Sequence, residues 1–284
     1  MKAIPKSSAA THGAQTVQRS CMLLRLIARN NRTGLRLVDI YRACELERPT
    51  AHRLLQALVS EGFLKQGPGS KLYFLGSALY AIGLSATPQQ SLRDICHPFL
   101  RRIAAETGDT VFLAQRENLD SVCLDRAEGA FPVKAYVVEI GHRRPLTVGG
   151  SSLAILSTLP DDEIDRICQS NYARTIQAHP RYLESALRER IQDSKRDGYL
   201  LSPVLDIPDI LTIAVPLVTN NRFPTAAISV STVSSRLDKT RAAQVALLLR
   251  ATVDKIVELI NQDQDQDENS VDMAGVSGLL DHAP

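Results

Sequence analysis

Apolar side chains recur with helical spacing in two short segments near the start of the chain. In residues 37–44, and again in residues 51–58, they follow the i, i+3, i+4, i+7 order that lines one helix face. The members are Leu37, Ile40, Tyr41 and Cys44 in the first segment and Ala51, Leu54, Leu55 and Leu58 in the second. Only a tight turn fits between the segments, and Pro49 suits the first turn of the second helix. The pattern predicts a helix-turn-helix, which presents its second helix to the major groove of DNA.

The polar face of this second helix is the first candidate for binding DNA. Arginine can form two hydrogen bonds with guanine and glutamine two with adenine, while a threonine near the helix N-terminus suits a phosphate oxygen. A solvated surface helix is the alternative, because such residues cover many helices that contact nothing. The candidate side chains are Arg48, Thr50, His52, Arg53 and Gln56.

A β-hairpin is predicted directly after this helix. Phe63–Gln66 and Lys71–Leu75 resemble short strands, and residues 67–70 form a Gly/Pro-rich turn between them. Lys65 and Lys71 would lie near the phosphate backbone if the hairpin serves as a wing. An ordinary solvated hairpin is the alternative. With the wing, the first part of the chain is predicted to be a winged helix-turn-helix.

Two further helices complete this first part. From Thr16, a suitable N-cap, one helix is expected to pack on the helix pair. Its expected apolar stripe consists of Val17, Cys21, Leu24, Ile27 and Ala28. Residues 76–87 suggest a connecting helix with Leu79 and Ile82 exposed on one side. Since a lone linker would leave that side uncovered, packing against a second copy of the chain is expected.

The second part of the chain alternates between helical and strand-like patterns. An apolar stripe over residues 92–103 is interrupted by Pro98, which should kink the helix or begin a second one, and Gly108 ends it. The other expected elements are strands at Thr110–Gln115, Ser121–Leu124, Phe131–Glu139, 211–218 and 225–232, and helices at Ser151–Leu159, 161–170, 181–196 and Arg236–Ile260. An antiparallel sheet flanked by helices is an α+β fold.

The charge is divided unequally along the chain. Residues 1–75 contain twelve Lys/Arg and four Asp/Glu, a net charge of +8, so residues 76–284 carry −6 of the whole-chain +2. The basic first part is therefore the candidate for contacting nucleic acid. The five cysteines are widely spaced and predict neither disulfides nor a metal site. No signal sequence and no apolar run of about 18 residues occurs, so a cytoplasmic protein without membrane contact is expected.

No pattern typical of an enzyme occurs. The Gly149-Gly150-Ser151-Ser152 run lacks the lysine of a phosphate-binding loop, and GxSxG, HExxH and CxxC are absent. The six histidines are scattered, so no catalytic residue, metal ligand or cofactor is predicted. An enzyme with a winged-helix targeting domain and a winged-helix module that binds proteins remain the alternatives to a DNA-binding regulator.

A small polar pocket is a further possibility in the second part. Ser229 and Ser231 share one face of a predicted strand, and Thr212 and Ala214 share one face of the strand before it. Free N–H groups at the start of the helix at residues 150–151 would favour an anion. Spacing alone nevertheless favours serines on a half-solvated sheet face.

The order and spacing of several segments resemble IclR-type transcriptional regulators, from about Thr16 to about Asn261. These segments are TVQRSCMLLRLI, LVDIYRACELERPTAHRLLQALVSEGFL, LYFLG, LRDICHPFLRRIAAETGDTVFLA, GHRRPL, the Gly198-Tyr199 pair, IAVPL and ISVS. The resemblance implies a repressor or activator that binds double-stranded operator DNA as a dimer or tetramer. It also implies that a small organic acid modulates this binding.

The composition of the two ends predicts a loose arm and an acidic tail, and the resemblance implies the domains between them and an effector site. The segments are a flexible arm (1–15), a winged helix-turn-helix domain (16–76), a linker helix (77–90), a GAF-like effector-binding domain (91–262) and a disordered acidic tail (263–284). The implied effector residues are Gly150, Ser151, Ser202, Ile210, Thr212, Ser229 and Ser231.

The sequence departs from the family pattern at four places. Glu45 stands where glycine is usual in the turn, and Glu47-Arg48-Pro49 replaces Pro-Lys-Ser. Ser202 replaces an acidic pocket residue, and Ser152-Leu153 replaces Gly-Lys. The DNA sequence read is therefore expected to differ from that of typical IclR-type regulators, and the departures at the pocket leave the identity of the ligand open.

Overall fold

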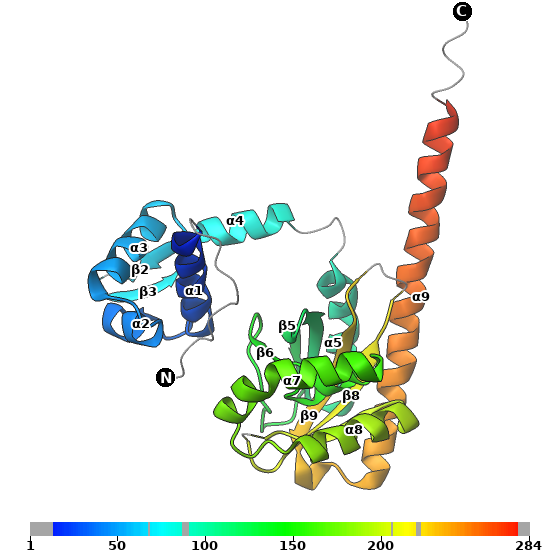
Figure 1. The fold of residues 1–284 in the computed structure, drawn as a ribbon. Helices are drawn as coiled ribbons and strands as arrows, with labels where there is room; N and C mark the ends of the chain where they lie inside the picture. Colours follow the sequence, from blue (N-terminus) through cyan, green and yellow to red (C-terminus); the bar gives the residue numbers. More distant parts are fainter. Residues whose placement is uncertain (1–13, 68, 87–90, 206, 220–222, 278–284) are drawn as a thin grey trace, which may run out of the picture. The chain divides into compact units, whose positions relative to one another are not determined.

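The computed structural model describes residues 14–67, 69–86, 91–205, 207–219 and 223–277. The chain divides into two compact units between Ser91 and Leu92, and each unit is described by itself (Figure 1). The division lies next to the domain boundary expected at residue 91. Residues 1–13 of the expected arm lie outside the described residues.

The first unit has the predicted winged helix-turn-helix fold. Its elements are α1 (Gln15–Arg29), β1 (Leu35–Arg36), α2 (Leu37–Ala43), α3 (Arg48–Ser60), β2 (Leu64–Gln66), β3 (Leu72–Leu75) and α4 (Ser77–Ala86). The three strands form an antiparallel sheet in the order β1-β3-β2, and the β2–β3 hairpin is the wing. The wing thus follows α3 directly in the chain.

The core of this unit joins α1, α2, α3 and the hairpin. Ile40 of α2, Leu55 of α3 and Leu64 of β2 are buried in one cluster with residues of α1. The expected α1 stripe is only partly right, because Ile27 is buried but Val17 is 63% exposed. The buried α1 residues are Leu23, Leu26 and Ile27. Since this segment is apolar on more than one face, spacing alone does not select the buried side.

The turn between α2 and α3 uses an unusual backbone conformation. Glu45 has φ 51°, in the left-handed region, as the usual glycine at this position led us to expect. The Leu46 N–H donates to the Tyr41 carbonyl at 2.9 Å and closes the turn. Because a residue with a Cβ is strained in this region by about 1 kcal/mol, the turn forms at a cost. α3 then begins at Arg48 with Pro49 in its first turn, as predicted.

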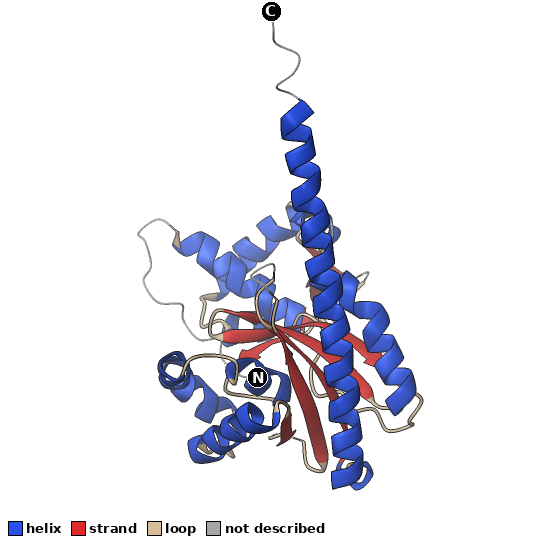
Figure 2. Ribbon diagram, turned by 90° about the vertical axis from the view of Figure 1, so that its right-hand side faces the viewer, coloured by secondary structure: helices blue, strands red, loops and turns tan. Residues whose placement is uncertain are grey.

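The second unit is a six-stranded antiparallel sheet between two layers of helices (Figure 2). Its elements are α5 (Leu92–Thr107), β4 (Thr110–Glu117), β5 (Asp120–Glu128), β6 (Arg143–Pro145), α6 (Gly150–Leu156), α7 (Asp161–Ala178), α8 (Glu184–Asp197), β7 (Leu200–Pro203), β8 (Ile210–Leu217), β9 (Ala226–Val233), the 3-10 helix η1 (Ser234–Arg236) and α9 (Lys239–Ser277). The strand order is β6-β5-β4-β9-β8-β7. The α+β fold is therefore confirmed.

Successive side chains of the central strands point to opposite faces of the sheet and pack against one helix layer or the other. Ile213 of β8 and Val230 of β9 belong to the core with α5 and α9. Ala214 and Ala227 belong to the core with α6, α7 and α8. This alternation follows from the two-residue repeat of a strand. It leaves Ser229 and Ser231 on the α6 side of the sheet.

In the second unit, one predicted strand is absent and two observed strands were not predicted. Phe131–Glu139 is an irregular segment, in which Tyr136 and Val137 donate to the Lys134 and Ala135 carbonyls rather than to a neighbouring strand. The strand that pairs with the outer edge of β5 is β6, which was not predicted. The edge strand β7 was not predicted either. Pairing with a distant strand decides these assignments more than local composition does.

The two long helices also differ in detail from the expectations. Pro98 lies inside α5 without dividing it. The acidic tail was predicted to be disordered from residue 263, but α9 continues to Ser277 (Figure 1). α9 contains no proline and its first glycine is Gly275, so its sequence can continue a helix. Residues 278–284 of the tail lie outside the described residues.

The five cysteines are free, and four of them are buried. Within the described residues, no helix is long and apolar enough to cross a membrane. The same residues contain no group of His, Cys, Asp or Glu side chains arranged to hold a metal ion.

We expect Glu45→Gly to raise the free energy of unfolding of the first unit by about 0.5–1 kcal/mol, because glycine adopts positive φ without strain. Denaturant unfolding followed by circular dichroism measures this change. Glu61→Gly is the matched control, because Glu61 has φ −83° and gains nothing from glycine. Equal effects of the two substitutions would contradict the strain at Glu45.

Candidate DNA interface and candidate ligand pocket

One face of α3 is held against the core and the other carries the predicted DNA-binding side chains. Ala51 and Leu55 are fully buried, which fixes the rotation of the helix. Of the predicted residues, Thr50 is half-buried, and the others are exposed, namely Arg48, His52, Arg53 and Gln56. The structure therefore brings these five residues together on one helix.

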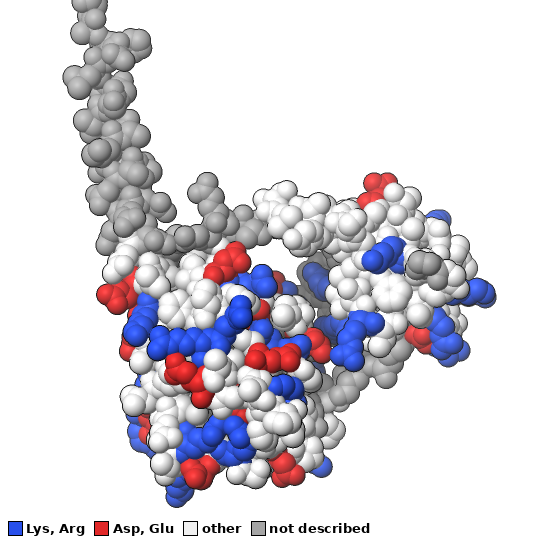
Figure 3. Space-filling model, turned by 180° about the vertical axis from the view of Figure 1, so that it is seen from behind, with Lys and Arg blue, Asp and Glu red and all other residues white. Residues whose placement is uncertain are grey.

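The basic side chains of α3 and the wing are available for phosphate oxygens. Among the described residues, no carboxylate lies within 4.0 Å of Arg48, Arg53, Lys65 or Lys71. Lys65 and Lys71 are exposed on β2 and just before β3. On the face seen in Figure 3, Lys and Arg side chains are spread over the first unit with fewer acidic ones among them. Unpaired exposed cations of this kind suit the phosphate backbone of DNA.

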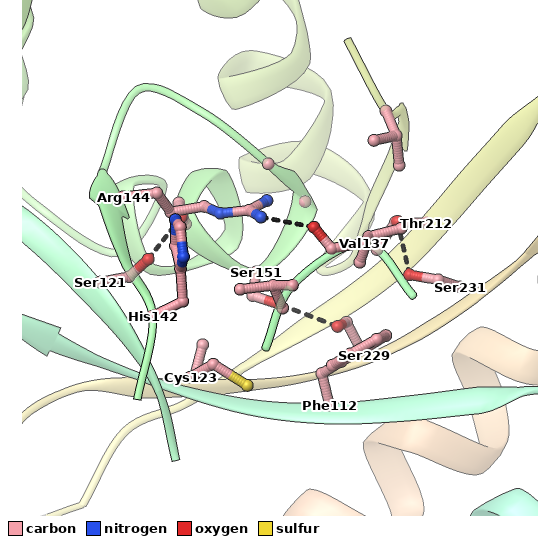
Figure 4. A pocket seen from close by; sticks show the side chains of 16 residues that line it. Phe112, Ser121, Cys123, Val137, His142, Arg144, Ser151, Thr212, Ser229 and Ser231 are labelled. Carbon is pink, nitrogen blue, oxygen red and sulfur yellow. Dashed lines mark hydrogen bonds between the residues drawn. The ribbon is translucent and has the colours of Figure 1, made fainter. Parts of the chain in front are cut away.

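A hollow in the second unit lies beside the start of α6 (Figure 4). It contains about 430 Å³ of space outside the protein atoms, its opening to solvent included. Residues of β4, β5, β8, β9 and α6 line it, together with Val137 and Val138 of the irregular segment. Five of the seven predicted effector residues belong to this lining: Gly150, Ser151, Thr212, Ser229 and Ser231.

Hydroxyl groups bond to each other in pairs along this lining. Ser151 Oγ lies 2.8 Å from Ser229 Oγ, and Thr212 Oγ1 lies 2.8 Å from Ser231 Oγ (Figure 4). A hydroxyl can donate one hydrogen bond and accept two, so each pair keeps unused capacity. These groups can therefore exchange partners with a polar ligand.

The other two predicted effector residues lie elsewhere. Ser202 of β7 is buried opposite Thr212, donates from Oγ to the Pro203 carbonyl at 3.1 Å and lines a different hollow. Ile210 is buried at the start of β8 opposite Val233 and does not line the first hollow. Neither side chain joins the hydroxyl pairs.

Arg144 is the pocket residue that sequence reasoning missed. It projects from β6 into the lining, where its Nη2 donates to the Val137 carbonyl at 2.6 Å. Its neighbour Arg143 bonds to Glu117 at 2.6 Å. Because alternate strand residues face opposite sides, one of two adjacent arginines in a strand must turn inward. The GHRRPL segment contained this signal, but β6 was not predicted.

Cys123 also lines the hollow. Burial raises the pKa of its thiol to about 11, although the nearby Arg144 and Arg126 guanidinium groups act in the opposite direction. The thiol is therefore protonated at neutral pH. It is a small apolar wall of the hollow and not a nucleophile.

Two glycines allow α6 to approach the sheet. Gly149 precedes the helix with φ 92°. A Cβ on Gly150 would lie 2.6 Å from Thr212 Cγ2, which is closer than atoms can pack. Helix and strand therefore touch at a position where only glycine fits.

Comparisons with known proteins identify this combination of domains. Residues 16–68 match the IclR helix-turn-helix domain, and residues 84–258 match the domain described as bacterial transcriptional regulator IclR C-terminal. The chain belongs to the IclR family. It is thus a transcriptional regulator with a helix-turn-helix DNA-binding domain and not an enzyme, as the segments quoted above predicted.

The similarity to other IclR-family proteins covers most of each chain. The HTH-type transcriptional regulator XynR of Escherichia coli K12 is 25% identical over 229 residues, which are 81% of this chain and 90% of XynR. The transcriptional repressor IclR of the same strain is 24% identical over 249 residues, covering 85% and 89%. A crystal structure of an IclR homolog from Microbacterium hydrocarbonoxydans, complexed with 4-hydroxybenzoate, has a TM-score of 0.68 at 21% identity and covers 86% and 98%. The structural likeness shows a shared fold.

We expect Gly150→Ala to lower the free energy of unfolding of the second unit by about 1–3 kcal/mol, because the added methyl group overpacks α6 against β8. Thermal unfolding measures the loss. Gly83→Ala in α4 is the control, because its Cβ would meet no atom within 4 Å and alanine favours a helix. A Gly150→Ala protein as stable as the unsubstituted chain would contradict the close approach.

Proposed function

We propose that this IclR-family regulator binds a specific operator through α3 and the wing, and that a small organic acid in the hollow beside α6 alters that binding. The observation that supports the proposal most is the hollow, which paired hydroxyls and Arg144 line. It lies in the second unit, whereas the DNA-binding helix belongs to the first. Such a separation of two sites is what allosteric control requires.

The exposed face of α3 supports sequence-specific binding. Arg53 and Gln56 lie in the middle of the helix, where they can bond to base edges in the major groove. Arg48 and Thr50 stand at its N-terminus, where a phosphate is favoured by the helix dipole. Lys65 and Lys71 of the wing would contact the backbone and position the protein. His52 lies beside Arg53 and completes the proposed interface.

A second copy of the chain would supply the second half of an operator. One recognition helix covers only half a site, and paired half-sites lie about 34–36 Å apart or a multiple of this. α4 carries large apolar side chains that its own unit does not cover: Tyr80, Ile82 and Leu84 are 73%, 53% and 59% exposed. Burying them between copies would hold two first units together. We therefore propose a dimer or tetramer as the DNA-binding form.

The chemistry of the hollow favours an acid. Among the described residues that line it are Arg144 and His142 but no Asp or Glu, and the hydroxyl pairs can donate hydrogen bonds to carboxylate oxygens. Phe112, Val137 and Val138 offer an apolar wall for the body of such a ligand. The complex of a family member of the same fold with 4-hydroxybenzoate, a small aromatic acid, supports this ligand class.

The start of α6 is the element through which such a ligand would act. A carboxylate that accepts from the hydroxyl now donating within the Ser151–Ser229 pair would replace that bond, and this would change how α6 is held on the sheet. A ligand shifts an equilibrium only by its difference in affinity for the two states. For allosteric proteins this coupling is about 1–3 kcal/mol, or roughly 5- to 150-fold in DNA affinity.

We expect Arg53→Ala to cost about 1–3 kcal/mol of specific operator binding and to relax selectivity at one base pair. Lys71→Ala should instead weaken binding to all DNA sequences and reduce the salt dependence of affinity. Fluorescence anisotropy with operator and unrelated DNA at several salt concentrations measures both effects. Arg25→Ala, an exposed arginine on α1, is the control and should leave base selectivity intact. An Arg53→Ala protein with unchanged selectivity would show that Arg53 does not contact bases.

We expect the double substitution Ser229→Ala and Ser231→Ala to weaken binding of a small carboxylate such as 4-hydroxybenzoate without weakening DNA binding in its absence. Two hydrogen-bond partners are removed, and almost no volume is lost. Calorimetry measures the ligand and gel shift the DNA. Ser170→Ala, at an exposed serine of α7, is the control outside the hollow. Unaltered carboxylate affinity in the double variant would remove Ser229 and Ser231 from the effector site.

A further inference from the structure

A second hollow lies against the first, and Gly149 lines both. It contains about 450 Å³ of space outside the protein atoms, its opening included, between α6, α8, the segment before α8 and β7. Arg181 and Arg190 stand in its lining, Arg181 exposed and Arg190 half-buried. The proposed effector does not occupy this second hollow.

Three basic residues of α7 and α8 are held in ion pairs, unlike Arg181 and Arg190. Arg174 pairs with Asp120 at 2.6 Å, Arg188 with Asp165 at 2.6 Å, and Lys195 with Asp161 at 2.6 Å. Within the described part of the chain, Arg181 and Arg190 make neither an ion pair nor a hydrogen bond. Two unpaired cations that face one hollow repel each other, so an anion between them is favoured.

The rest of the lining suits an anion with an apolar body. Leu153 and Leu187 are buried and form an apolar wall, while Ser202 brings a hydroxyl. No Asp or Glu is among the described residues of this lining. Tyr182 stays neutral, because burial raises the pKa of its hydroxyl, and that hydroxyl has no hydrogen-bond partner among the described residues. None of the described lining residues therefore carries a negative charge that would compete with an anionic ligand.

We propose that this second hollow binds a small organic dianion. One anionic group pairs with Arg181 and the other with Arg190, and the carbon chain between them lies against Leu153 and Leu187. Guanidinium groups bind carboxylates through charge-assisted hydrogen bonds, which are about twice as strong as neutral ones. The ligand class is thus a dicarboxylate rather than a monocarboxylate.

This site goes beyond the proposed function, because it adds a second ligand to the same unit. Both hollows include the backbone of Gly149, which leads directly into α6. A ligand that fixes this segment from one side changes the affinity for a ligand on the other side, and the coupling is reciprocal. Binding itself can be measured without DNA.

Calorimetry of the full chain with glutarate and with butyrate tests the proposal. Glutarate has a carboxylate at each end and butyrate at only one, so glutarate should bind more tightly. The double substitution Arg181→Gln and Arg190→Gln should lower glutarate affinity by roughly tenfold or more, because it removes both charge-assisted partners. Each single substitution should give a part of this loss. Since the two side chains make no bonds within the described structure, thermal unfolding of the variants should be unchanged.

Arg188→Gln is the matched control, because it removes an arginine of the same helix that is already paired. It should leave glutarate affinity unchanged. The double variant Ser229→Ala and Ser231→Ala should also retain glutarate binding, which separates this hollow from the effector hollow. The proposal is overturned if glutarate binds no better than butyrate or does not bind. It is also overturned if the Arg181 and Arg190 double variant keeps full affinity, or if only the serine variant loses it.

Discussion

The contact of α6 with the sheet is the constraint on which the second unit depends. Gly150 leaves no room for a Cβ above Thr212, so the helix start and β8 can touch. Only at this separation can Ser151 reach Ser229 across the gap. A larger residue would move the helix outward and separate the hydroxyl groups. The missing side chain of Gly150 therefore fixes both the packing of the helix and the chemistry of the hollow next to it.

Local periodicity predicted those elements whose buried face is set within a few residues. Ala51 and Leu55 of α3 are one helical turn apart, and polar residues cover the opposite face, so one orientation of the helix is best. In α1 the run from Met22 to Ile27 is apolar on several sides, and the buried residues are chosen by contacts with the other helices. Phe131–Glu139 has strand-like side chains but no hydrogen-bonding partner strand. A local sequence pattern does not show which distant strand a segment pairs with.

Pocket residues could be predicted where the repeat of one strand or the start of one helix determines their direction. They could not be predicted where pairing between distant strands determines it. Ser229 and Ser231 follow from the two-residue repeat of β9. Arg144 enters the hollow only because β6 pairs with β5, with Arg144 opposite Ser121. Ser202 was assigned by family resemblance to the effector site, but the structure turns it to the second hollow. The position of the Arg144 guanidinium in the first hollow thus depends on β6, an edge strand of three residues.

The hydroxyl pairs explain why the hollow should select anions over neutral ligands. Ser151 and Ser229, like Thr212 and Ser231, already share one hydrogen bond in the unliganded hollow. A neutral ligand would replace one hydrogen bond by another of about 1 kcal/mol net value and gain little. An anion forms stronger charge-assisted bonds with the same hydroxyls and also meets the guanidinium of Arg144. The free energy gained by an anion exceeds that gained by a neutral ligand, and this difference, rather than the number of polar contacts, would set the selectivity of the site.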